Sequence, residues 1–205
     1  MTPDLPAHPW NIRAVAVEAA VAGSAMARRV RERLPHVPFT VTGLQDAPAS
    51  GPQDAAASGP QDAPASGMQD APATSPPDAP GRVLRLSAHK GRFLRPCPGA
   101  KSYRCCGYRI VHIGEGCPMD CTYCILKAYL RTDDLRVFAN TGDMFRELGE
   151  VFGADRSRRF RVGTGEFADS LALEALTGHT GEILDFLRDF DNVVLELKTK
   201  TDDLS

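Results

Sequence analysis

Apolar residues recur along this chain with two different spacings, one typical of helices and one typical of strands. Helical spacing of apolar residues predicts a helix over residues 18–34, which Pro35 ends, and further helices from about residue 125, over 143–152 and over 180–190. Alternating or continuous apolar runs predict strands at 37–41, 82–86, 108–113, 160–162 and 193–198. Strands that alternate with helices indicate an α/β fold whose parallel strands form a sheet or a barrel.

Residues 45–80 break this pattern with a short repeat. The unit Gln-Asp-Ala-Pro-Ala-Ser-Gly returns every eight residues, and the segment contains no Lys, Arg, aromatic, Leu, Ile or Val residue. Such a segment cannot offset the roughly 1–2 kcal/mol of backbone entropy that each ordered residue loses. We therefore predict three parts: a small α/β module over 1–44, a disordered linker over 45–80, and a larger α/β domain over 81–205.

Composition narrows the chemistry that is expected of the chain. The 205 residues carry a formal net charge of −2, with no apolar run long enough to span a bilayer and no signal-peptide pattern at the N-terminus. We therefore expect a cytoplasmic protein with no membrane partner. Because cytoplasmic thiols stay reduced, the six cysteines indicate metal or redox ligands before disulfides.

Three cysteines share one loop between a predicted strand and a predicted helix. Cys117, Cys121 and Cys124 follow the spacing C-x3-C-x2-C. Thiolates are soft ligands that favour iron–sulfur clusters, and three ligands for four irons leave one iron open for chemistry. The alternative is a structural zinc site completed by Cys105 and Cys106, but zinc prefers four closed ligands, and adjacent cysteines chelate one ion awkwardly.

The cysteine loop resembles that of the radical S-adenosylmethionine (SAM) superfamily. This resemblance implies that a [4Fe–4S] cluster binds SAM through its open iron and that an electron donor, such as a flavodoxin or ferredoxin, drives cleavage to methionine and a 5′-deoxyadenosyl radical. It places Tyr123 against the adenine, although a core aromatic is the alternative. Gly163, Gly165 and Glu166 look like the superfamily's Gly-Gly-Glu element, which puts Glu166 on the SAM amino group.

Motifs over residues 82–205 are similar to those of the spore photoproduct lyase family. They are Cys97-Pro98-Gly99, Cys105-Cys106-Gly107-Tyr108, Cys117 to Leu126, Gly163 to Leu173 and Leu195 to Lys200. The resemblance implies a lyase that repairs a thymine photoproduct in DNA, with Lys200, or Lys198 as an alternative, on the SAM carboxylate. It also implies a partial (β/α) barrel of about three units. We expect a fragment whose last strand leaves an open sheet edge and which could lack activity in isolation.

The chain departs from that family where the lyases relay a hydrogen atom. The resemblance places a tyrosine at the position of Ile125 and a donor cysteine near Thr164. Neither residue present here can relay hydrogen, so the activity differs or another thiol, among Cys97, Cys105 and Cys106, serves as donor. Those three thiols could equally be buried or hold a second cluster.

The basic segment and the function each have more than one interpretation. Eight Lys or Arg residues and no Asp or Glu lie within residues 82–112, which favours either a nucleic-acid contact or a surface balanced by acidic residues elsewhere. His112 is interpreted as structural. The alternatives for function are a radical SAM protein with another substrate, or a non-catalytic iron–sulfur or zinc module.

Overall fold

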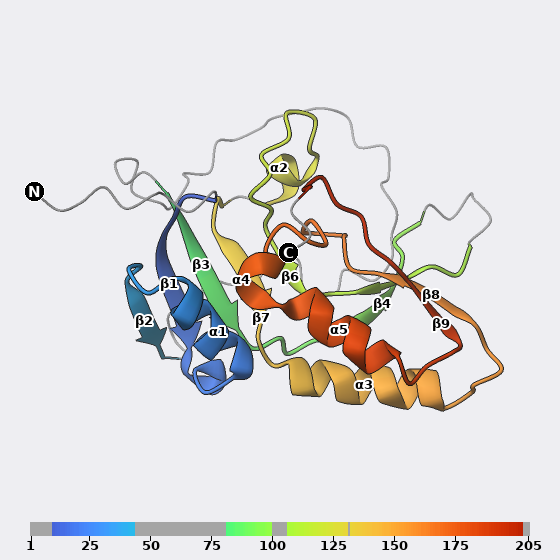
Figure 1. Ribbon diagram of the computed structural model, residues 1–205. Coiled ribbons are helices and arrows are strands. Elements are labelled where there is room, and N and C mark those ends of the chain that lie inside the picture. Colours follow the sequence, from blue (N-terminus) through green and yellow to red (C-terminus); the bar gives the residue numbers. More distant parts are fainter. Residues whose placement is uncertain (1–9, 44–80, 100–105, 131, 203–205) are drawn as a thin grey trace, which may run out of the picture.

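The computed structural model describes residues 10–43, 81–99, 106–130 and 132–202, and the repeat predicted to be disordered lies outside them. In chain order the elements are β1 (Ile12–Glu18), a 3-10 helix (Ala19–Val21), α1 (Ala25–Arg33), β2 (Phe39–Thr42), β3 (Arg82–Ser87), β4 (Leu94–Pro96), β5 (Arg109–Val111), β6 (Gly114–Glu115), α2 (Leu126–Tyr129), β7 (Leu135–Phe138), α3 (Thr141–Gly153), β8 (Phe160–Gly163), α4 (Glu174–Thr177), α5 (His179–Leu187) and β9 (Val193–Glu196). They form two sheets with helices packed against them (Figure 1). Within the described ranges, no helix has the length and apolar character needed to cross a membrane.

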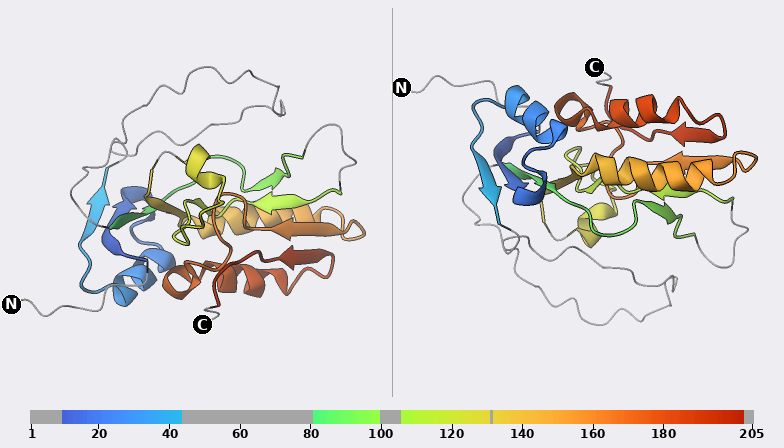
Figure 2. Two further views of the ribbon diagram at one scale, coloured as in Figure 1. Left: turned by 90° about the horizontal axis from the view of Figure 1, so that it is seen from above. Right: turned by 90° about the horizontal axis from the view of Figure 1, so that it is seen from below.

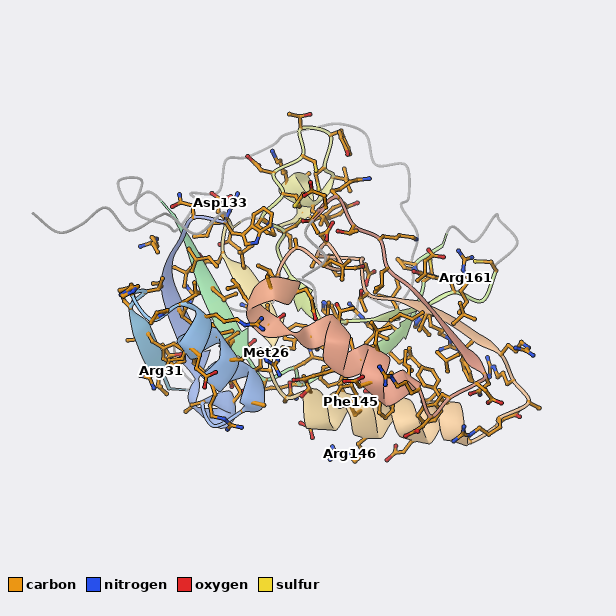
Figure 3. The ribbon with its side chains drawn as sticks, in the orientation of Figure 1. Met26, Arg31, Asp133, Phe145, Arg146 and Arg161 are labelled. Atoms are coloured by element: carbon orange, nitrogen blue, oxygen red, sulfur yellow. The ribbon has the colours of Figure 1, made fainter. Side chains whose placement is uncertain are left out.

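The first sheet has the strand order β2-β1-β3-β7-β6. All its pairings are parallel except that of β6 with β7. Helix α1 packs on this sheet, and Met26 points from the helix into the core with only 1% of its surface exposed (Figure 3). Because β1 lies between β2 and β3, the sheet combines strands from both sides of the repeat.

The helix predicted over residues 18–34 is too long at its N-terminal end. Glu18 is the last residue of β1, which pairs with neighbours on both edges, so tertiary pairing outweighs the helix propensity of the alanines that follow. The helix itself begins after Ser24, whose hydroxyl accepts a hydrogen bond from the Ala27 N–H at 3.1 Å. This N-cap satisfies a donor that the first turn leaves free.

The second sheet has the order β4-β5-β8-β9, in which β5, β8 and β9 are parallel and β4 pairs with β5 in the antiparallel sense. Helices α3 and α5 lie side by side along this sheet (Figures 1 and 2). Phe145 of α3 stacks on Phe186 of α5 with ring centroids 4.8 Å apart (Figure 3). Among the described strands β9 pairs with β8 alone, and Val194 is 61% exposed, which agrees with the predicted open edge.

The strand predicted over 108–113 is shorter in the structure, where β5 covers Arg109–Val111, and a second short strand, β6, follows directly after the predicted range. The chain leaves β5 at Val111 and enters β6 at Gly114, which pairs with β7 of the first sheet. Glycine is required at this crossing, because a Cβ on Gly114 would lie 2.3 Å from the Arg136 carbonyl oxygen. Gly116 has a φ of +91°, and a Cβ there would lie 2.6 Å from the Asp134 carbonyl oxygen.

Arginines of α1 fix the first helix to the second half of the chain. The guanidinium groups of Arg29 and Arg33 donate to backbone carbonyls in the last turn of α4, where the negative end of the helix dipole lies. Arg29 also forms an ion pair with Glu182 of α5 at 2.9 Å. These contacts help to hold the two sheets and their helices together.

Candidate metal and cofactor site

The three loop cysteines line one pocket. The loop that carries them follows β6 and precedes α2, and the pocket has a volume of about 290 Å³. Cys117, Cys121 and Cys124 all contribute to its wall, together with Arg82 and Asp133. Figure 3 shows Asp133 near one end of the first sheet. The fold therefore brings the predicted ligands to one place.

Cys117 is the most constrained of the three thiols. Burial raises the pKa of the Cys117 thiol, while hydrogen bonds from the backbone N–H groups of Met119 and Asp169 oppose this rise. Negative charge on Asp169 and on Cys124 raises the same pKa further. The two backbone N–H groups therefore favour a thiolate at Cys117, whereas burial and the nearby negative charges disfavour it.

The described residues contain no group of three His, Cys, Asp or Glu side chains placed to hold one metal ion. The zinc site considered above includes Cys105, which lies outside those residues. Three thiolates are soft ligands of the kind that hold iron–sulfur clusters, so the donor set itself fits a cluster.

Apolar side chains project outward from the cysteine loop and from α2. Tyr123 is 76% exposed, Ile125 66% and Tyr129 67%. The alternative interpretation of Tyr123 as a core aromatic is wrong. An exposed ring beside the pocket is free to stack on a ligand. The helix predicted from residue 125 is only one turn long, over Leu126–Tyr129.

The predicted Gly-Gly-Glu element lies at the end of β8 and in the turn that follows it. A Cβ on Gly163 would lie only 1.8 Å from the Tyr108 hydroxyl oxygen, so the tyrosine packs closely against this glycine. Gly165 is exposed and lies beside Ser170. Glu166 accepts a hydrogen bond from Arg95 of β4 at 3.1 Å.

Arg95 is a site residue that the sequence reasoning did not single out. Its guanidinium carbon lies 5.7 Å from the centre of the Phe167 ring, and its Nε atom is buried without a hydrogen-bond partner in the described structure. Burial raises the pKa of Glu166, and the charge of Arg95 lowers it. The carboxylate keeps free lone pairs beside Arg95, so a second cation could share it.

The two candidate lysines differ in their surroundings. Lys198 forms an ion pair with Glu196 at 3.0 Å, and its Nζ lies 4.8 Å from the centre of the Tyr108 ring. The backbone N–H of Lys200 donates to Asp169 Oδ2 at 2.7 Å. Its side chain is exposed and forms no ion pair within the described residues. Lys200 is thus the freer of the two to meet a ligand.

The remaining candidates lie in varied settings. Thr164 is buried and donates its hydroxyl to Ser170 Oγ at 2.9 Å. Cys106 is exposed, Cys97 is partly buried where the β4–β5 hairpin leaves β4, and Cys105 lies outside the described residues. His112 is 5% exposed among aromatic rings, which agrees with a structural role.

Acidic residues balance part of the basic segment over 82–112. Arg85 pairs with Asp134 at 2.7 Å, and Arg92 approaches Glu147 to 3.8 Å. Together with the pairing of Arg95, these contacts support the balanced-surface interpretation for three of the eight basic residues.

Solved structures of spore photoproduct lyase share this fold. A complex with dinucleoside spore photoproduct matches with a TM-score of 0.62 and 15% identity over 92% of this chain and 49% of that one. A variant with bound AdoMet and dinucleoside spore photoproduct matches with a TM-score of 0.59 and 15% identity over 92% and 49% of the two chains. Another variant with the dinucleoside photoproduct gives 0.61, with 14% identity over 90% and 48%.

Comparisons of sequence find no relative: no model of a known protein family matches the chain, and neither does any curated protein. The chain spans about half the length of the solved structures that it matches. No closed barrel is formed within the described residues, where β5, β8 and β9 provide three parallel strands. This chain therefore shares the fold of spore photoproduct lyase over about half of that protein's length, and the predicted α/β class is confirmed.

Proposed function

We propose that the chain binds a [4Fe–4S] cluster through Cys117, Cys121 and Cys124 and binds SAM beside it. One observation carries this proposal. The three thiols of the C-x3-C-x2-C loop line a single pocket. The shared fold adds support, because one of the matching lyase structures holds AdoMet. When bound, the cluster supplies the electron for reductive cleavage of SAM.

We propose that three loops share the binding of SAM, with contacts from residues that are not among those lining the cysteine pocket. Tyr123 offers an exposed ring for the adenine, Glu166 a carboxylate for the amino group, and Lys200 an exposed ammonium for the carboxylate. Gly165 leaves the turn after β8 open on its exposed side, whereas Tyr108 covers Gly163. We propose all five residues as SAM contacts, with Gly163 contributing through its backbone beside Tyr108.

For the whole protein we propose lyase chemistry on DNA that carries a thymine photoproduct, with a flavodoxin or ferredoxin as electron donor. The support is the fold shared with spore photoproduct lyase structures that contain the dinucleoside photoproduct. The described part of the chain contributes the cofactor loops, and we propose that substrate contacts come largely from the other half of such a fold.

Iron and sulfide analysis after anaerobic reconstitution tests the cluster directly. We expect about four irons and four sulfides per chain, lost when Cys121 is replaced by Ala. Cys106→Ala is the matched control, because that thiol is exposed and does not line the pocket. Stoichiometric zinc without labile sulfide would contradict the cluster and favour the structural alternative.

Release of 5′-deoxyadenosine separates an enzyme from a binding module. Reduced, reconstituted protein should cleave SAM if the half-fold retains activity, and a full-length relative with the same loops should do so in any case. A relative that binds the cluster but releases no 5′-deoxyadenosine would reduce the proposal to an iron–sulfur module.

One observation favours a radical SAM activity other than photoproduct repair. Ile125 has no O–H or S–H bond, and Thr164 is buried with its hydroxyl donated to Ser170, so neither residue can quench a product radical. The test is anaerobic repair of the thymine photoproduct by a full-length relative that shares both residues. Efficient repair that survives replacement of Cys97, Cys105 and Cys106 would refute this second candidate.

A further inference from the structure

Asp169 lies where three loops of the candidate site meet. Its Oδ1 accepts hydrogen bonds from the backbone N–H groups of Leu171 and Ala172, both at 2.9 Å, which fixes the turn after β8. The same oxygen accepts the Thr199 hydroxyl at 2.7 Å, and Oδ2 accepts the Lys200 N–H at 2.7 Å. One carboxylate therefore fastens the turn that follows β9 to the turn that follows β8.

The backbone of the same segment reaches the cysteine loop. The N–H of Asp169 is one of two backbone donors to the Cys117 sulfur, and the carbonyl oxygen of Phe167 accepts the Gly116 N–H at 2.9 Å. The charge of Asp169 also acts on the Cys117 sulfur. Asp169 thus contacts a candidate cluster ligand on one side and the Thr199–Lys200 turn on the other.

We propose that Asp169 is a positioning residue that sets Lys200 at a fixed place relative to Cys117, so that a ligand of the cluster also meets the lysine. This inference rests on the proposed function, since it concerns the same SAM site. Asp169 is the link because its two carboxylate oxygens accept hydrogen bonds from two consecutive residues of the turn, Thr199 and Lys200, while its backbone N–H donates to the Cys117 sulfur.

Hydrogen bonds made by Ser170 explain why loss of the Asp169 hydrogen bonds need not unfold the protein. Ser170 donates its N–H to the Lys198 carbonyl oxygen at 3.1 Å and accepts the Lys198 N–H on Oγ at 3.0 Å. These bonds attach the end of β9 to the loop after β8 independently of Asp169. The Asp169 carboxylate is therefore not needed to attach β9, and it fixes the direction of the turn after Lys198 instead.

Asp169→Asn is the sharpest test. The amide keeps Oδ1 for Leu171, Ala172 and Thr199, but its NH₂ group cannot accept the Lys200 N–H. The matched control is Asp155→Asn, which makes the same change at an exposed turn where Asp155 accepts from Ser157 and Arg158. That turn precedes β8, at the opposite end of the strand from the cysteine loop.

Three measurements decide the outcome. In Asp169→Asn, hydrogen exchange at the Lys200 amide should accelerate about tenfold, as expected for one lost hydrogen bond, with or without the cluster. The iron content should stay unchanged, while the dissociation constant for SAM in reconstituted protein rises about tenfold. The midpoint potential of the cluster should shift to a more positive value, because removal of a negative charge near Cys117 favours the reduced cluster. Asp155→Asn should change none of these.

The inference is overturned if Lys200 exchange stays at the wild-type rate, or if SAM affinity falls no further than in the control. It is equally overturned if Asp169→Asn loses iron and melting temperature together, since that pattern indicates a purely structural residue. Wild-type protein that carries the cluster but binds no SAM would instead overturn the proposed function.

Discussion

Two buried histidines should make the fold sensitive to mild acid. His112 is 5% exposed and His179 is 2% exposed, and the ring nitrogens of both have no hydrogen-bond partner in the described structure. Burial lowers the pKa of His112 from 6.5 to about 3, with smaller contributions from Arg95 and His89. Burial, with a contribution from Arg29, lowers the pKa of His179 from 6.5 to about 4.

Nearby carboxylates do not reverse this effect. Glu115 lies 3.7 Å from His112 Nε2, but it also forms an ion pair with Arg136 at 3.4 Å. A folded-state pKa below the unfolded value means that the stabilisation is fully present above pH 6.5. It is lost as the pH falls toward 4 and then 3, because the unfolded chain takes up protons that the folded chain excludes.

The magnitude follows from proton linkage. Between pH 7.5 and pH 5.5 each histidine should lower the free energy of unfolding by about 1.4 kcal/mol, so the two together lower it by about 2.7 kcal/mol. That loss is large against a typical total of about 5–15 kcal/mol for a domain. Near pH 5 the slope should reach about 2.5 kcal/mol per pH unit.

Urea unfolding across this pH range is the assay. His179→Leu and His112→Phe should each reduce the slope by about one proton, whatever their effect on absolute stability. His36→Gln is the control, since His36 is an exposed side chain and its replacement should leave the slope unchanged. A variant slope equal to that of the wild type would refute the reasoning, because it would mean that the buried ring gains its proton without unfolding.

Three further changes test other parts of the structure. Gly178→Ala should cost roughly 1–3 kcal/mol, because φ is +61° and a Cβ would lie 2.7 Å from Arg29, whereas Gly23→Ala, with no atom within 4 Å, should be nearly neutral in thermal unfolding. Arg95→Met should destabilise by roughly 1–3 kcal/mol at pH 7, because it leaves the partly buried Glu166 carboxylate without its ion-pair partner, and adding Glu166→Gln should restore the loss. Deletion of residues 45–80, with a short Gly-Ser link, should leave the melting temperature nearly unchanged, and a large loss would show that the repeat contributes contacts.

Local patterns in the sequence predicted the elements that surround the site. The cysteine loop does lie between a strand and a helix, and α3, β8, α5 and β9 lie close to their predicted ranges. What the patterns missed depends on distant partners. The strands β1, β4 and β7 were not predicted, because each is defined by pairing with another strand that lies elsewhere in the sequence.

The same limit applies to the residues of the site. Spacing alone places three thiols on one loop, but nothing in the local sequence distinguishes Asp169 or Arg95 from other charged residues. Asp169 becomes visible only because β8 and β9 are parallel neighbours, so that the turns at their carboxyl ends meet. Arg95 reaches Glu166 only through the antiparallel pairing of β4 with β5.

The loops that carry the proposed cluster and SAM ligands lie together and are bonded to one another. Every residue proposed for the cluster and for SAM follows β6, β8 or β9, and hydrogen bonds join those three turns directly. Turns that share backbone bonds can hold a cofactor without help from further strands. We therefore expect the described loops to bind the cluster and SAM, and we propose that turnover of a substrate depends on the remainder of such a fold. Cofactor binding and catalysis are then separable, and each can be measured without the other.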